Sequence, residues 1–149
     1  MSVMWWPSNR AAEADVKKQG GIKPPCDAER KCKQIIDNEF KAMQQRLNDF
    51  DVEIDPLLLV QIASFEKGFK IQVCYSIKEL REKTKDYGVL TRAEARERIQ
   101  SDIKTAFGFL VGLCGEAAKP LENYPKRILG LLEWELHCKL TEYVNTWVY

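Results

Sequence analysis

The reactive side chains of this chain are few, and its single histidine is the first to consider. His137 lies between Leu136 and Cys138 in a segment with helical periodicity. A cysteine–histidine nucleophile pair needs the two groups to face each other, but adjacent residues of a helix point about 100° apart. We therefore interpret His137 as a surface or helix-packing residue. The sequence predicts no catalytic residue.

Four residues have the chemistry of zinc ligands, namely Cys26, Cys32, His137 and Cys138. Structural zinc sites usually place roughly two to four residues between paired cysteines, whereas five residues separate Cys26 from Cys32. The chain also contains no Gly-rich phosphate loop and no nucleophile elbow. We therefore expect no metal, no cofactor and no enzymatic activity.

The composition is typical of one globular domain rather than of a nucleic-acid-binding protein. The chain has 149 residues, and 23 basic side chains against 22 acidic ones give a net charge of +1. Nucleic-acid binding normally requires a basic excess on one face. A helical nucleic-acid-binding protein remains the less favoured alternative, through the cluster of Arg92, Arg96 and Arg98 with Lys17 and Lys18.

The cysteines and the N-terminus favour a cytoplasmic protein. The five cysteines are odd in number and widely spaced, which is typical of reduced thiols. The N-terminus lacks the basic and apolar regions of a secretory signal. No apolar run reaches the roughly 20 residues that a membrane-spanning helix needs, so we expect no transmembrane segment.

The elements that must position any site are helices, because apolar residues recur every three or four positions. Capping boxes at Ser76–Glu79 and Thr91–Glu94 mark two helix starts. Residues 70–76 alternate like a strand, but with no second strand to pair with we interpret them as helical or irregular. By residue number the expected helices span 8–19, 27–49, 55–69, 76–88, 91–115 and 125–147.

These patterns predict an all-α fold, a compact bundle of six to seven helices around a buried central helix that contains the apolar run 106–115. Residues 1–25 are expected to form an N-terminal arm and residues 26–149 a single helical domain. We expect Trp5 and Trp6 of the arm to pack back on the domain, with an exposed docking anchor as the alternative.

Three segments resemble the Bcl-2 family. The stretch Phe109-Leu-Val-Gly-Leu-Cys-Gly-Glu116 is similar to the family's central helix, and Leu140-Thr-Glu-Tyr-Val-Asn-Thr-Trp-Val148 is similar to the helix that follows it. Cys32-Lys-Gln-Ile-Ile-Asp-Asn-Glu-Phe40 resembles a BH3 helix. Ser101-Asp-Ile-Lys104 stands where the family has Asn-Trp-Gly-Arg, so the resemblance is to a divergent viral or invertebrate homologue.

The resemblance implies an apoptosis regulator that works by binding. Such domains hold the amphipathic BH3 helix of a pro-apoptotic protein in a surface groove and thereby sequester it, and partners can recruit them to mitochondria. Lys104 takes the place of the family's ligand-pairing Arg and is a poorer bidentate partner. Carried over to this sequence, the groove residues are Phe40, Met43, Leu47, Phe65, Phe69, Lys104, Phe107 and Val111.

A different function stays open. The main alternative is a helical interaction module or assembly subunit of another family, with Trp5 and Trp6 as its docking arm. A homodimer would also cover the surplus of apolar helix faces.

Overall fold

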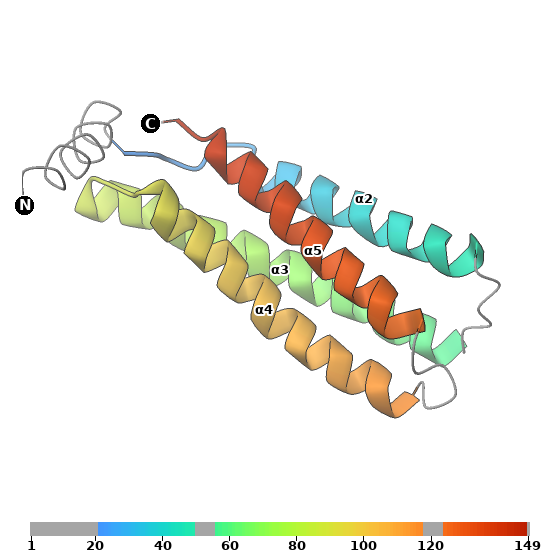
Figure 1. Cartoon of the computed structure of the whole chain (residues 1–149). Helices are drawn as coiled ribbons and strands as arrows, with labels where there is room; N and C mark the ends of the chain where they lie inside the picture. The colour runs from blue at the N-terminus through green and yellow to red at the C-terminus, as the bar shows by residue number, and fades with distance from the viewer. Residues whose placement is uncertain (1–20, 50–55, 118–123, 149) are drawn as a thin grey trace, which may run out of the picture.

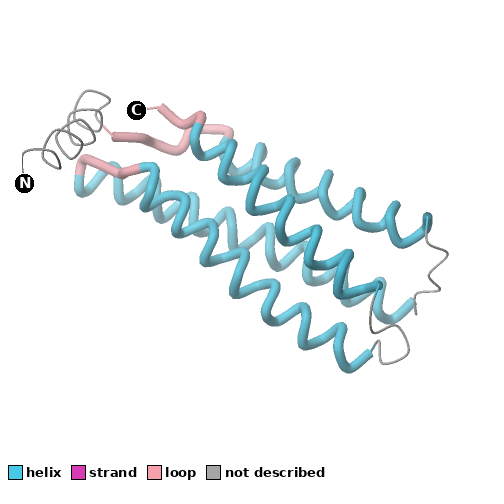
Figure 2. The backbone as a smooth tube through the Cα atoms, viewed as in Figure 1, coloured by secondary structure: helices cyan, strands magenta, loops and turns pink. Residues whose placement is uncertain are grey.

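The computed structural model describes residues 21–49, 56–117 and 124–148, and this part of the chain is almost entirely helical (Figure 2). In a few helical stretches the structure describes the backbone alone, without side chains: residues 57, 58, 87, 109–117 and 124–127. The all-α class predicted from the sequence is confirmed for the described residues. Their helices are α2 (Ala28–Asp49), α3 (Pro56–Tyr87), α4 (Arg92–Ala117) and α5 (Tyr124–Asn145).

The four helices form a closed ring. α2 and α4 each contact both α3 and α5, so α3 and α5 are diagonal to each other. Successive helices run in opposite directions along one long axis (Figure 1), which is the up-down-up-down topology of a four-helix bundle. For the described residues, the expectation of six to seven helices around a central one is therefore wrong: each of the four helices belongs to the ring.

The core is built from apolar stripes at helical spacing, and α2 shows this most clearly. Its buried side chains follow one another at intervals of three or four residues, as the sequence predicts, so that one face of the helix turns away from water. Leu132, Leu136 and Leu140 of α5 are fully buried on the facing side of the ring. The buried residues of α2 are Ala28, Cys32, Ile36, Phe40, Met43 and Leu47.

α3 is one continuous helix of 32 residues, where the sequence predicts two helices with a helical or irregular connection. Gly68 lies within it and does not end it. Val73 and Ile77 are fully buried, and their packing against the other helices outweighs the weak strand preference of β-branched residues. Merging these segments is one reason why the helix number is lower than expected.

The two predicted capping boxes have different outcomes. At the start of α4, the Glu94 amide N–H donates to Thr91 Oγ1 at 3.1 Å, so this helix cap is confirmed. Ser76 instead lies in the middle of α3, fully buried, and its hydroxyl donates to the Asp102 carboxylate of α4. The prediction of a helix start at Ser76 is therefore wrong, because a tertiary partner takes the hydroxyl.

A polar network surrounds that contact between α3 and α4. Arg98 Nε donates to Ser76 Oγ at 3.1 Å, and Arg98 Nη1 lies 2.6 Å from Glu79 Oε2. Burial raises the pKa of Asp102, while the hydrogen bond from Ser76 and the charge of Arg98 act in the opposite direction. The network thus supplies partners to a carboxylate that is only 9% exposed.

Residues 21–26 cross one end of the bundle and pair with the α3–α4 connection. The Ile22 N–H donates to the Leu90 carbonyl at 2.7 Å, forming an isolated antiparallel bridge, and the Ile22 side chain is buried in the core. Gly21 has φ +81°, and a Cβ there would lie 2.9 Å from the Leu90 carbonyl oxygen. Only glycine fits this position without strain.

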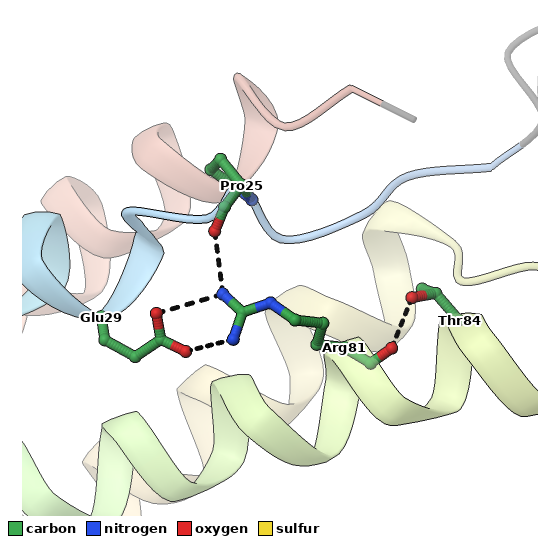
Figure 3. Close-up of polar contacts among 4 residues, drawn as sticks. All are labelled: Pro25, Glu29, Arg81 and Thr84. Atoms are coloured by element: carbon green, nitrogen blue, oxygen red, sulfur yellow. Dashed lines mark hydrogen bonds and ion pairs between the residues drawn. The ribbon is translucent and has the colours of Figure 1, made fainter.

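Arg81 of α3 ties this crossing segment to α2 (Figure 3). Its Nη1 donates to Glu29 Oε1 at 2.5 Å, and its Nη2 donates to Glu29 Oε2 at 3.1 Å and to the Pro25 carbonyl at 2.9 Å. A bidentate Arg–carboxylate pair fixes geometry as well as charge. The hydrogen bonds from Arg81 lower the pKa of the Glu29 carboxyl below its ordinary 4.5.

We expect Glu29→Gln to destabilise the fold by about 1 kcal/mol at pH 7, because the charge-assisted pair with Arg81 is lost. Since the folded-state pKa of Glu29 is lowered, its contribution is fully present above pH 4.5 and is lost as the pH falls through the folded value. Urea unfolding at a series of pH values measures this, with Glu39→Gln on the same helix as the control. A difference from wild type that persisted unchanged at pH 3 would contradict the assignment.

Candidate functional site

The residues predicted to line a BH3 groove lie mostly in the interior of the bundle. Five of them are at most 5% exposed, Phe65 is partly buried and packs against the core, and Lys104 is exposed on α4. The Val111 side chain lies outside the described residues. The five buried ones are Phe40, Met43, Leu47, Phe69 and Phe107.

Four of these side chains form one aromatic cluster. The ring centroid of Phe65 lies 6.2 Å from Phe40, 6.2 Å from Phe69 and 5.6 Å from Phe107, the last in an edge-to-face arrangement. Such pairs add to the stabilisation that burial gives. The cluster joins α2, α3 and α4. The structure thus brings the predicted residues together as packing between helices, and their assignment to a ligand groove stays a prediction.

The candidate zinc ligands and the histidine are spread over the bundle. Cys26 is exposed before α2, whereas Cys32 is buried in the core and burial raises the pKa of its thiol to about 12. His137 Nε2 lies 4.0 Å from Glu133 Oε1, one turn away on α5. Across the described parts of the chain, no three His, Cys, Asp or Glu side chains gather in a way that could hold a metal ion.

An open groove of about 700 Å³ runs along the outer face of α5 beside α4. Trp134 stands in it with 64% of its surface exposed. Two carboxylates, Glu133 and Glu142, contribute the negative charge of its lining. The lining residues are Gln100 from α4 and Gly130, Glu133, Trp134, His137, Cys138, Thr141, Glu142 and Asn145 from α5.

The helical geometry of α5 explains why Trp134 points outward. Leu132 and Leu136 face the core, and position 134 between them turns to the opposite side of the helix. One turn earlier, Gly130 leaves the groove open, since a Cβ there would meet nothing within 4 Å. An indole exposed to this extent is unusual among large aromatic side chains, so Trp134 marks a candidate binding surface.

Sequence reasoning missed Trp134 because it followed the apolar stripe of the last helix. Trp134 lies outside that stripe, between Glu133 and Glu135. An aromatic residue flanked by charges on the polar face of an amphipathic helix is the signal that could have identified it.

Comparisons with known proteins leave the family open. A scan against protein-family models gave no match, and neither the curated proteins nor the solved structures gave a significant one. Among the described helices, none combines the length and the apolar character needed to cross a bilayer.

Two alanine substitutions compare the contribution to stability of a surface aromatic residue, Trp134, with that of a core aromatic residue, Phe107. We expect Phe107→Ala to lower the free energy of unfolding by about 3–5 kcal/mol, because it leaves a cavity in the aromatic cluster. Trp134→Ala should change it by less than about 0.5 kcal/mol, as is usual at exposed positions. Urea unfolding followed by circular dichroism measures both. A loss above 2 kcal/mol for Trp134→Ala would give the indole a structural role instead.

Proposed function

We propose that this protein is a protein-interaction module that binds an apolar side chain of a partner helix in the α4–α5 groove. The observation that carries the proposal is the exposed indole of Trp134 beside the open space at Gly130. Tryptophan is one of the residues enriched among the side chains that dominate binding energy at interfaces. Eight of the nine lining residues come from α5 and one from α4, so the groove follows the length of a helix, a geometry that suits a helical partner.

The charge of the groove favours partners with basic side chains. Glu133 and Glu142 lie at the groove on either side of Trp134 in sequence, and His137 is the single basic residue of the lining. Complementary charges at the rim speed association and exclude acidic partners. We therefore expect a partner helix that places Lys or Arg around one large apolar residue.

Binding accounts for the described side chains better than catalysis does. A reactive cysteine needs a low thiol pKa, whereas burial raises the pKa of both Cys32 and Cys74. The buried carboxyl of Asp102 accepts a hydrogen bond from the Ser76 hydroxyl within the polar network between α3 and α4. These groups serve packing and specificity of the fold.

Selection of helical peptides from a displayed library tests this function. We expect selected peptides to lose at least ten-fold in affinity to Trp134→Ala and to Gly130→Leu, which fills the groove, because each variant removes the anchor or its space. Val89→Ala is the matched control, since Val89 is 46% exposed in the connection between α3 and α4 and does not line the groove. If the selected peptides bind both groove variants as tightly as the wild-type protein, the assignment of this groove as the binding site is wrong.

BH3 sequestration is the second candidate. It is favoured by the clustering of the predicted residues Phe40, Phe65, Phe69 and Phe107 around one point of the bundle. Since most of these rings are buried, a BH3 ligand would have to separate α2 from α3 and α4 to reach them. Kinship with the Bcl-2 family is part of the same proposal.

Titration calorimetry with a panel of BH3 peptides tests this second candidate. Submicromolar binding that weakens in Lys104→Ala, an exposed position that should leave the fold intact, and survives Trp134→Ala would support it. Absence of binding across the panel would exclude it. Binding lost only in Trp134→Ala would assign the peptide to the α4–α5 groove instead.

A further inference from the structure

The outer face of α3 carries an exposed apolar stripe that the proposed function does not use. Val60, Ile71 and Tyr75 are 62%, 61% and 56% exposed. Together with the small residues Ser64 and Gly68 they follow one another at intervals of four, four, three and four, so they share one side of the helix. α2 and α4 pack on other sides of α3, and all five residues of the stripe are exposed in the part of the chain that the structure describes.

Among the described residues, nothing in the fold of a single chain requires glycine at position 68. It lies inside a helix, where glycine is less favourable than alanine, and its φ is not in the left-handed region. A Cβ at this position would meet nothing within 4 Å. What a glycine here does permit is the close approach of another helix, because interaxial distance depends on the side chains at the contact.

At Ser64 and Ile71 the order of a small and a large residue along the stripe is self-complementary. When two copies of α3 pair antiparallel about an axis between Lys67 and Gly68, Val60 lies opposite Tyr75 and Ser64 opposite Ile71. The large Ile71 of one copy then packs over the small Ser64 of the other, and the glycines lie at the centre. A two-fold axis makes each contact occur twice, as in an isologous dimer.

We propose that this face of α3, from Val60 to Tyr75, binds the same face of a second copy of this chain. The stripe covers 16 residues, about 24 Å of helix. Pairing over a single helix of this length gives a small contact, of the class below about 1,200 Å² that is typical of weak or transient interfaces. The dimer is therefore weak, and it forms and dissociates with concentration.

One charge opposes the pairing. The two Lys67 side chains lie near the axis, where like charges repel. Higher salt screens this repulsion, so association tightens modestly with ionic strength, and Lys67→Ala tightens it by roughly two-fold. A contact driven by opposite charges would respond to salt in the reverse direction.

Sedimentation equilibrium from about 1 µM to 1 mM tests the proposal through an exchange of residue sizes. Ile71→Ser leaves a gap over Ser64 and Ser64→Ile creates a clash with Ile71, so each should weaken association about ten-fold or more. The double variant Ser64→Ile/Ile71→Ser restores the match with sizes exchanged and should recover affinity to within about three-fold. Only the antiparallel register described above predicts this recovery.

Two further variants separate loss of the interface from loss of the fold. Gly68→Ala should raise the thermal unfolding midpoint of the monomer, because alanine favours the helix, and yet weaken association. Trp134→Ala should leave association unchanged, which keeps this proposal independent of the α4–α5 groove. A chain that stays monomeric at 1 mM, or a dimer that is indifferent to Ile71→Ser, overturns the proposal.

Discussion

The contact between the first and the last described helices is the constraint on which the rest of the bundle depends. α2 and α5 are far apart in sequence, and their pairing closes the ring that α3 and α4 begin. Closure gives every apolar stripe two neighbours, so that Ile36 of α2 and Leu136 of α5 are both fully removed from water. An open row of the same helices would leave the two outer stripes half solvated, at a cost of roughly 25 cal/mol per Å².

Polar contacts then select one register for this ring. Because the apolar stripes repeat every three or four residues, a helix could slide by one turn along its axis and lose only a modest part of its apolar contacts. The same shift would separate Asp102 from Ser76 and Arg81 from Glu29, leaving partly buried charges without partners. An unpaired buried charge costs far more free energy than an imperfect apolar contact. These few pairs therefore fix the position of each helix along the bundle axis.

How much the sequence reveals depends on whether the deciding partner is local. The helix start at Thr91 was predictable, since its partner Glu94 is three residues away. The same motif at Ser76 failed because Asp102, 26 residues further on, takes the hydroxyl. The helical spacing of the apolar residues in α2 was predictable from the sequence, but an apolar stripe alone does not distinguish a buried ridge from the wall of a groove. Trp134 was not identified from the sequence because what makes it a candidate is the exposure of its side chain. That exposure depends on how the four helices pack.

The diagonal placement of α3 and α5 has a consequence for valency. Helices at opposite corners of the ring direct their outer faces away from each other, so whatever covers the α3 stripe leaves the Trp134 groove open. A pair of chains joined through α3 carries two such grooves facing outward on opposite sides. Two weak sites on one particle gain avidity toward any target that displays repeated copies of a helix. The molecule would then act as a concentration-dependent crosslinker, assembling only where its own copies accumulate.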